Sequence, residues 1–562
     1  MTTSEEERLK KRCNDLEFLT LMQAADKIYR HQNQMGDKKR SNERAIEIYQ
    51  LLFSYIDDSF AWDKSELYRK IGNCYYAMGD RDHARINLEK TLNYSTTNAA
   101  VYKRLASIFY AFDQDKAIEY NSRAFTLDNN FANYSSRNFL TLQTDAYTPR
   151  GVREKLEEYA SGWPRKFAAN GTVYTHERLK VRGKLKKDKK LRIAYLSSDF
   201  YSHTMMSFII PLLEHHDRSK YDITLYSTVT QKYDKVTTRI MKLCSRFIDC
   251  SRLNNFELAQ RIYEDEIDIL IDLGGFTYGH NRSFALLFRP APIQVQYLGF
   301  LGTYGFKEVD YIMTDKYTVP KGSEDLYTET PMYIEAGMER FGFMRKTELP
   351  DITPLPMEKN DYVTFGSFND IAKITTTTLR FWSKLMEAVP TAHLLIYRYG
   401  TRLTPDKIEQ LYQRLENLGV ARERVAFCKE KLDPHYKAYD LADIGLDSMP
   451  FGGLSITIEA LHMGLPTLCC PGEAFASRGT GRVNKMLGID GVFNASDEED
   501  FARKGAVLAA DYGKMRYYRE NLRKIVQASP LTQDLDGFAR SVEAAYVKAW
   551  CKYVDENSAD NK

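Results

Sequence analysis

The sequence has few cysteines, no long apolar run and almost no net charge. Its eight cysteines are scattered over 562 residues, without a Cys-x-x-Cys pair or a Cys/His spacing suited to zinc, which argues against a disulfide framework and a zinc site. No stretch approaches the roughly 18 consecutive apolar residues of a membrane helix. Residues 1–15 are charged and lack the apolar segment of a secretory signal. We therefore expect a cytoplasmic protein with reduced thiols and no membrane span.

The near-neutral net charge also indicates which kind of binding partner to expect. The 79 Lys and Arg residues are balanced by 76 Asp and Glu residues, a net charge of +3. This excess is too small for the one-sided field of a nucleic-acid-binding protein, so nucleic acid is not the expected partner. The hydrophobic and charged fractions, 43% and 28%, are typical of a globular chain. The length predicts about three to four domains.

The first 150 residues contain an internal repeat of helical character. Residues 65–98 align with residues 99–130, so that Tyr68 recurs as Tyr102 and Tyr75 as Phe109, each 34 positions later. This period is typical of tetratricopeptide (TPR) repeats, in which pairs of helices stack. A weaker match upstream, near residues 24–53, indicates a third, irregular repeat. The alternative is an ordinary antiparallel helical bundle, and residues 14–140 are helical under either interpretation.

Residues 151–190 show weaker periodicity and end in a basic stretch that continues to residue 192. We interpret this segment as a solvated linker ahead of the next domain, since runs of charge usually face water. A contact with an acidic surface is the alternative.

From residue 191 onward, short apolar runs alternate with helical segments, which predicts parallel sheets covered by helices. The fold class is thus α + α/β, with TPR-like repeats followed by a pair of Rossmann-like halves at 191–345 and 346–562. Prolines at 350, 354 and 356 mark the junction, and the amphipathic segment 538–550 is expected to cross back onto the first half. The runs that predict strands are 193–196, 223–226, 269–271, 295–298 and 311–313 in the first half and 363–366, 393–397, 425–427, 444–446 and 467–469 in the second. Ligands of such sheets bind at the carboxyl ends of the strands, so we expect a two-sided cleft between the halves.

The strongest local signal for a binding site is the segment 446–461. A strand ends there in a loop with Gly452 and Gly453, and a helix opens at Ser455. The N-terminus of a helix offers unpaired N–H groups and partial positive charge, and glycines let an anion approach the backbone. This segment predicts a diphosphate site, although such turns also occur where only close packing is needed.

Three further residues follow strands or open helices near the same edges. Lys373 comes after the strand 363–366, His435 opens the helix before Asp447, and His203 follows the first strand. A cation beside a diphosphate neutralises charge that develops on a nucleotide leaving group, and an imidazole can accept a proton from an attacking hydroxyl. Taken one by one, each could also be a surface lysine or a structural histidine.

Four motifs carry a resemblance to a known family. They are Arg-Pro-Ala-Pro-Ile-Gln-Val-Gln-Tyr-Leu-Gly at 289–299, Asp-Phe-x-x-His at 199–203, Phe-Asn-x-x-x-Lys at 368–373 and Pro-Gly-x-x-x-Ala-Ser-Arg at 471–478. With them, residues 190–550 resemble the catalytic region of the bacterial TPR-containing protein O-GlcNAc transferase and SPINDLY-type family, which has the GT-B pair of Rossmann-like halves. The repeats ahead of this region extend the resemblance to nearly the whole chain.

The resemblance implies an inverting glycosyltransferase that needs no metal and no cofactor besides its nucleotide-sugar donor. UDP-GlcNAc is the leading donor, and the acceptor is a Ser or Thr hydroxyl of a polypeptide held by the TPR groove, with flagellin as a candidate. His203 and Lys373 are the implied catalytic residues. The implied donor-binding residues are His435, Gly453, Ser455, Ile456, Thr457 and Asp370. Within residues 191–562, the one Asp-x-Asp, at 534–536, lies far from the predicted cleft strands, which also favours a metal-independent reaction.

Departures from the family pattern leave the donor sugar open. Leu454 and Ile456 stand where relatives have polar residues, Asp370 where many have an amide, and Phe276 where many bacterial relatives have a histidine. UDP-glucose is therefore an alternative donor. Two alternative functions also stay open: an N-linked or small-molecule glycosyltransferase on the same scaffold, and a non-catalytic TPR scaffold with a degenerate donor site.

Overall fold

The computed structural model of the chain describes residues 3–32, 37–56, 61–110, 113–229, 233–277, 281–343, 349–400 and 403–558. The chain separates into two compact units. Unit 1 comprises residues 1–129 and 400–413, and unit 2 comprises residues 130–399 and 414–562.

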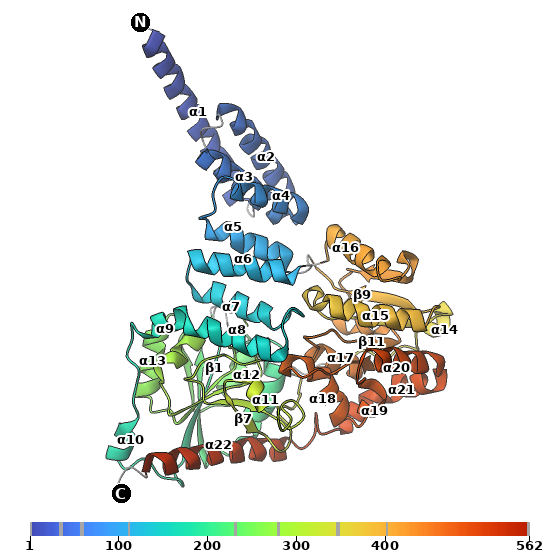
Figure 1. Ribbon diagram of the computed structural model, residues 1–562. Helices are drawn as coiled ribbons and strands as arrows, with labels where there is room; N and C mark the ends of the chain where they lie inside the picture. The colour runs from blue at the N-terminus through green and yellow to red at the C-terminus, as the bar shows by residue number, and fades with distance from the viewer. Residues whose placement is uncertain are drawn as a thin grey trace. The chain divides into compact units, whose positions relative to one another are not determined.

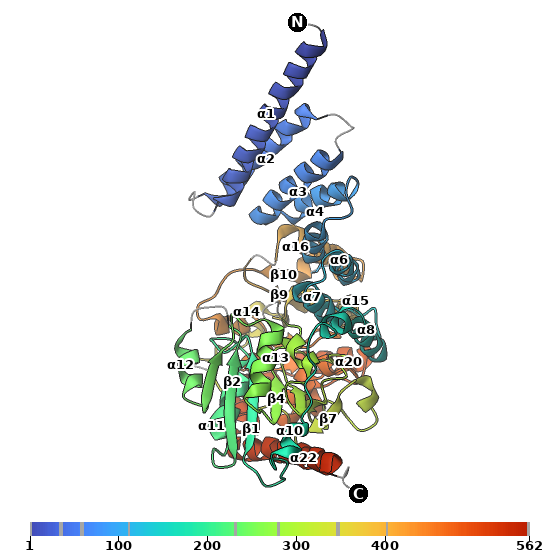
Figure 2. The same ribbon diagram turned by 90° about the vertical axis from the view of Figure 1, so that its left-hand side faces the viewer.

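Unit 1 is built of antiparallel helices (Figures 1 and 2). Its N-terminal part contains α1 (Thr3–Arg30), α2 (Lys38–Leu51), the 3₁₀ turn η1 (Leu52–Tyr55), α3 (Ala61–Met78), α4 (Arg81–Leu92), α5 (Ala99–Phe109) and α6 (Gln114–Leu127). The helix pairs α3/α4 and α5/α6 occupy the two predicted repeats and pack closely. Small residues make this possible, because Ala84 and Ala117 are fully buried and a Cβ atom at Gly72 would lie 2.8 Å from the Leu88 side chain. The prediction of a helical N-terminal region is confirmed.

Residues 151–190, which the sequence indicates as a linker, contain helices in the structure. They belong to unit 2, and the region from residue 130 onward forms α7 (Phe131–Thr141), α8 (Pro149–Ser161), α9 (Trp163–Ala168) and α10 (Glu177–Val181). Aromatic packing anchors α7, since the Tyr134 ring lies 5.2 Å from each of the rings of Phe276 and Phe284. Phe276 is thus part of a buried aromatic core.

The basic stretch that ends this region is only partly solvated. Lys184 and Arg192 both bind the Glu266 carboxylate, and Lys189 binds the buried Asp268 carboxylate at 2.6 Å. These pairs fasten the segment to residues just before β4 of the first sheet.

The first α/β half contains a seven-stranded parallel sheet in the order β3-β2-β1-β4-β5-β6-β7. Its strands are β1 (Leu191–Ser197), β2 (Tyr221–Ser227), β3 (Arg246–Asp249), β4 (Ile269–Asp272), β5 (Ile293–Gln296), β6 (Tyr311–Thr314) and β7 (Thr330–Tyr333). The connecting helices are α11 (Met206–His215), α12 (Lys235–Met241), α13 (Asn255–Glu264), η2 (Ser283–Phe288) and η3 (Glu324–Leu326). All five predicted strands are present, and β3 and β7 were not predicted.

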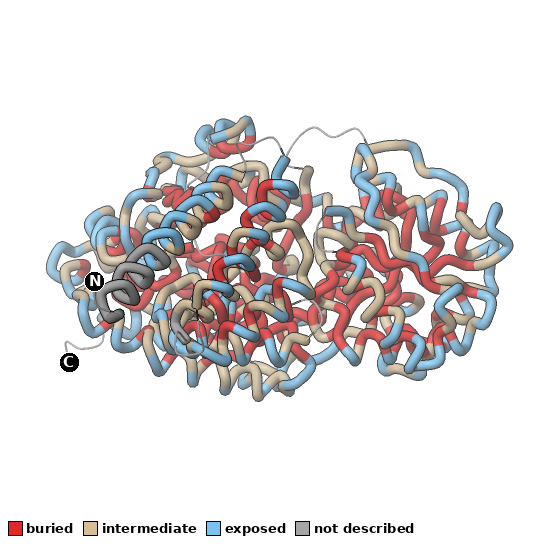
Figure 3. Tube along the Cα trace, turned by 90° about the horizontal axis from the view of Figure 1, so that it is seen from above, coloured by how far each residue is buried: buried red, intermediate tan, exposed pale blue. Residues whose placement is uncertain are grey.

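The second half contains a five-stranded parallel sheet in the order β10-β9-β8-β11-β12. Its strands are β8 (Thr364–Ser367), β9 (His393–Tyr397), β10 (Val425–Cys428), β11 (Ile444–Leu446) and β12 (Thr467–Leu468). The helices are α14 (Met357–Asn360), η4 (Ile371–Lys373), α15 (Thr376–Ala388), α16 (Pro405–Glu416), η5 (Arg422–Arg424), η6 (His435–Leu441), α17 (Ser455–His462), η7 (Phe475–Ser477), α18 (Gly479–Met486), α19 (Asp490–Phe493), α20 (Glu498–Ala510) and α21 (Tyr512–Ala528). Buried residues fill the interior of both halves (Figure 3).

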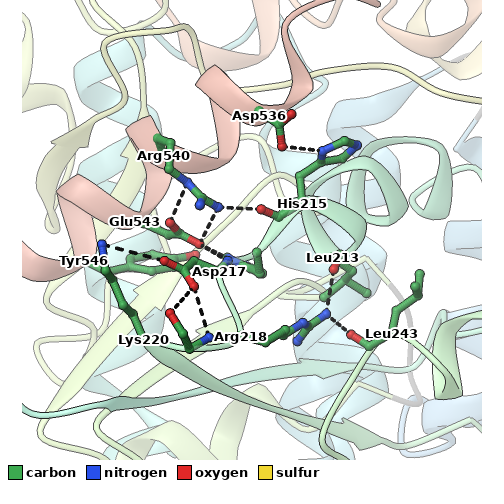
Figure 4. A network of polar contacts seen from close by, with 12 residues as sticks. Leu213, His215, Asp217, Arg218, Lys220, Leu243, Asp536, Arg540, Glu543 and Tyr546 are labelled. Carbon is green, nitrogen blue, oxygen red and sulfur yellow. Dashed lines mark hydrogen bonds and ion pairs between the residues drawn. The ribbon is translucent and has the colours of Figure 1, made fainter.

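The helix α22 (Leu535–Ser558) follows the second half in sequence but packs against α11 and β5 of the first. The Glu543 carboxylate accepts hydrogen bonds from His216 Nδ1 at 3.0 Å and from the Asp217 backbone N–H at 2.8 Å (Figure 4). The hydroxyls of Tyr546 and Tyr195 lie 3.1 Å apart. The first half therefore depends on a helix encoded after the second.

Within the part of the chain that the structure describes, no helix has the length and apolar character needed to cross a membrane.

Candidate functional site

Lys373 lies at the end of η4, directly after strand β8. Its ammonium group donates a 2.8 Å hydrogen bond to the backbone carbonyl of Gly452 and lies 4.3 Å from the centre of the Phe451 ring. Burial lowers the pKa of Lys373 to about 8, the Asp447 carboxylate opposes this change, and Arg398 adds to it. A lysine in this position carries a charge that is poorly solvated and is available to an anion.

Asp447, at the end of strand β11, fixes the neighbouring glycine loop. Its Oδ1 atom accepts hydrogen bonds from the Gly453 backbone N–H at 2.7 Å and from Asn369 Nδ2 at 3.0 Å. A Cβ atom at Gly453 would lie 2.8 Å from Thr457 Oγ1, which explains why the loop has glycine there. The sequence reasoning did not select Asp447 as a site residue, although a lone acidic residue between a strand and a Pro/Gly loop was the signal that could have identified it.

The helix α17 begins at Ser455, and no side chain caps its N-terminus. The hydroxyl of Thr457 is buried beside the glycine loop and lies 2.8 Å from the Thr480 hydroxyl. Ile456 packs against a buried cluster that includes Phe368. The Ser455 hydroxyl stands at the helix start, where it can join the first-turn N–H groups around an anion.

His435 lies at the start of η6 and is half-exposed. Its Nε2 atom is 3.3 Å from Glu459 Oε2 of α17, and its ring lies 4.0 Å from that of Tyr436. This contact brings His435 to the same helix that begins at Ser455. The group combines an aromatic face with a carboxylate, which suits a nucleoside.

The Asp370 carboxylate contacts both η4 and a neighbouring arginine. One carboxylate oxygen accepts from the Ala372 backbone N–H at 3.1 Å, which caps η4, and the other lies 3.2 Å from Arg398. The negative charge of Asp370 is thus balanced by Arg398.

His203 lies in the loop between β1 and α11, with 42% of its side chain exposed. Its Nδ1 atom accepts from the Met205 backbone N–H at 3.3 Å and is 3.7 Å from Asp199 Oδ2. Among the described residues, no hydrogen bond or ion pair links His203 to the seven predicted residues of the second half. The structure thus groups those seven around β8, β11 and α17 and leaves His203 on the first half.

The two halves meet in polar contacts and around a small cavity. Arg482 of α18 binds the buried Glu339 carboxylate and donates to Thr318 Oγ1 at 2.8 Å. The cavity, of about 70 Å³, is largely apolar and is lined from the first half by residues 301–303 and 326–327, from the second by Pro450 and 474–476, and by residues between 142 and 152. The Gly452 backbone N–H, which donates to the Ala476 carbonyl at 2.9 Å, joins this cavity wall to the loop that holds Lys373.

Two parallel α/β halves, with an uncapped helix start, a glycine loop and a lysine at the strand ends of the second, define the GT-B class of glycosyltransferases. Residues 171–341 and 355–538 match glycosyl transferase family 41, and the chain belongs to that family.

Relatives and a solved structure agree with this assignment. The chain is 30% identical over 422 residues to a tomato (Solanum lycopersicum) protein named probable UDP-N-acetylglucosamine–peptide N-acetylglucosaminyltransferase SPINDLY, a match covering 73% of this chain and 43% of that protein. The Arabidopsis thaliana protein of the same name is 31% identical over 420 residues, covering 72% and 44%. The chain thus spans less than half the length of these relatives. A mutant of the Thermobaculum terrenum O-GlcNAc transferase superposes with a TM-score of 0.77 at 25% identity, covering 97% of this chain and 99% of that one. The resemblance indicated by the four motifs is confirmed.

In the described residues, His, Cys, Asp and Glu side chains form no group of three or more suited to a metal ion.

Proposed function

We propose that this chain transfers GlcNAc from UDP-GlcNAc to Ser or Thr hydroxyls of a polypeptide, with inversion at the anomeric carbon. The observation that carries the proposal is the placement of Lys373 against the glycine loop, 2.8 Å from the Gly452 carbonyl. The names of the SPINDLY relatives support the donor and the peptide acceptor.

In this reaction the acceptor oxygen attacks the anomeric carbon as the bond to the UDP oxygen breaks, in a single displacement. Negative charge then grows on the departing diphosphate. Lys373, together with the N–H groups and the Ser455 hydroxyl at the start of α17, would stabilise that charge, which is the role a metal ion has in other transferases. The uridine end would lie along His435 and Glu459.

The acceptor hydroxyl must also lose its proton. His203 is our candidate for the group that contacts the acceptor and assists this step, since it follows β1 at the strand ends of the first half and is accessible. The repeats of unit 1 would hold the polypeptide, because stacked helix pairs form extended concave surfaces. A flagellin-type acceptor stays a prediction.

The test is an assay of the purified chain with UDP-GlcNAc, UDP-glucose and other nucleotide sugars, scored by release of the nucleotide and by mass spectrometry of Ser- and Thr-containing peptides. We expect turnover with UDP-GlcNAc and an O-linked product. Lys373→Met should lower turnover by at least about 100-fold, because loss of one preorganised charge from a transition state costs about 2.7–4 kcal/mol.

Lys384→Met is the matched control, since Lys384 lies in α15 and pairs with Glu499 near the surface. Near-normal turnover in Lys373→Met, or a product linked through nitrogen, would contradict the proposal. Absence of both turnover and nucleotide binding would favour the scaffold alternative.

A further inference from the structure

Unit 1 holds two arginines against one tyrosine ring. The guanidinium carbons of Arg81 and Arg104 lie 3.5 Å and 4.0 Å from the centre of the Tyr76 ring. Among the described residues, neither arginine forms an ion pair with a carboxylate. The Tyr76 hydroxyl is 2.7 Å from the Ser107 hydroxyl. Burial alone would raise the pKa of Tyr76, but this hydrogen bond and the two arginines lower it, which shows how positive the surroundings of the ring are.

A polar cavity of about 230 Å³ opens in the same unit, between α1, α2 and α3. It is lined by Asp26, Tyr29, Arg30, Tyr49, Arg69, Lys70 and Asn73. Its single lining carboxylate is already engaged, since Asp26 Oδ1 accepts from the Tyr49 hydroxyl at 2.6 Å and from Lys70 at 2.7 Å. The volume accommodates a carboxylate-bearing side chain together with water, which takes about 30 Å³ per molecule.

The cavity and the tyrosine ring belong to one surface. Arg69, Asn73 and Tyr76 are spaced four and three residues apart on α3, so they share a face of that helix. The positive charges of Arg104 and Arg69 both act on the Tyr29 hydroxyl, which lines the cavity. We call the surface formed by Tyr29, Arg69, Asn73, Tyr76, Arg81 and Arg104 the basic-aromatic face.

We propose that the basic-aromatic face binds carboxylate side chains of an acidic segment in the acceptor polypeptide. The inference rests on the proposed function, which assigns the acceptor to unit 1. Guanidinium groups pair with carboxylates through two parallel hydrogen bonds. Arg81 and Arg104 form no such pair with a carboxylate in the described residues, so both can bind one from a peptide.

A polypeptide fits the face better than a nucleic acid does. The whole chain has a net charge of only +3, and the face adjoins two carboxylates, Asp26 and Glu66, which bind Lys70 and Arg69. A phosphate backbone needs an extended run of cations, whereas an acidic peptide can offer single carboxylates to two arginines.

The experiment uses the full chain and three fluorescein-labelled 15-residue peptides. Each has a central Ser, and the flanking positions alternate Ala with Glu, Gln or Lys. Binding is followed by fluorescence anisotropy, and the expected result is at least tenfold tighter binding of the Glu peptide than of the Gln peptide. The combined Arg81→Gln and Arg104→Gln variant should remove most of this difference. Lysine at both positions should restore part of it, because the charge is kept.

Arg85→Gln is the matched control, since Arg85 lies on α4 and pairs with Glu89, and it should bind the Glu peptide normally. Circular dichroism checks that the variants are folded. Equal binding of the Glu and Gln peptides, or no loss in the double glutamine variant relative to the double lysine variant, would overturn the proposal. Tighter binding of a 12-nucleotide polyuridine than of the Glu peptide, if it depends on Arg81 and Arg104, would also overturn the proposal.

Transfer of GlcNAc to the same peptides separates this proposal from the proposed function. Equal transfer to the Glu and Gln peptides, with equal KM, would refute the role of the face and leave the transferase intact. Arginine-dependent binding of the Glu peptide without transfer from UDP-GlcNAc would refute the transferase, and with it the identity of the bound segment as an acceptor.

Discussion

UDP should bind more tightly when Lys373 is protonated, and measuring the affinity for UDP at different pH values tests this. Burial lowers the pKa of this lysine to about 8 in the free protein. A bound diphosphate would stabilise the charged form and raise the pKa toward the ordinary lysine value of about 10.4. By linkage, UDP then binds the protonated protein more tightly, and binding takes up protons wherever the free protein has lost them.

The size of the effect follows from the pKa. With a value of about 8, about nine in ten Lys373 side chains are charged at pH 7 and about one in ten at pH 9. If the neutral lysine binds UDP far more weakly, the apparent affinity falls about tenfold between pH 7 and pH 9. The terminal phosphate of UDP does not confound this, since a pKa near 6 leaves it largely ionised over the whole range.

Isothermal titration calorimetry in two buffers of different ionisation enthalpy measures both quantities. We expect almost no net uptake at pH 7, where a proton loss of about 0.1 from the UDP phosphate offsets the gain by Lys373, and an uptake of about 0.9 proton at pH 9. Lys373→Arg keeps its charge throughout this range, so in that variant both the proton uptake and the loss of affinity should disappear. The reasoning is refuted if the wild type binds UDP equally at pH 7 and 9, or if Lys373→Arg shows the same slope.

Two further predictions concern the first half. His203→Ala should slow transfer to peptide much more than it weakens UDP binding, because no contact in the described residues joins His203 to the glycine loop. Calorimetry with UDP and a transfer assay on one preparation test this. Equal losses of UDP binding and of transfer would indicate a structural role. Trp550→Ala should lower the free energy of unfolding by about 3–5 kcal/mol, because the side chain is fully buried and its Nε1–H donates to the Lys186 carbonyl at 2.8 Å. Urea denaturation measures this change, and a loss below about 1 kcal/mol would show that α22 is not firmly packed there.

In the seven-stranded sheet, the central strands could be predicted from the sequence and the two edge strands could not. Strands such as β1 and β4 are buried on both faces and therefore appear as continuous apolar runs. The missed strands, β3 and β7, lie at the two edges of the seven-stranded sheet. β3 begins and ends with charged residues and has no fully buried residue, and β7 contains Pro331, as edge strands tolerate.

The candidate site, too, could be predicted from the sequence only in part. Lys373 and the glycine loop carry chemistry that is visible locally, and the structure places them together. The turn of the Thr457 hydroxyl toward Thr480 depends on a partner 23 positions away that no local pattern reveals. The packing of α7 depends on distant residues in a similar way, since the rings that hold Tyr134 come from Phe276 and Phe284.

The position of α22 sets an order on folding during synthesis. Strands β1 and β2 leave the ribosome more than 300 residues before Glu543 and Tyr546, which pair with His216 and Tyr195. Before α22 has been synthesised, the side chains of His216 and Tyr195 in the nascent first half lack these partners, although all seven strands of that half are present. The two halves are therefore not modules that fold one after the other, and the second half must be translated before the first can be completed.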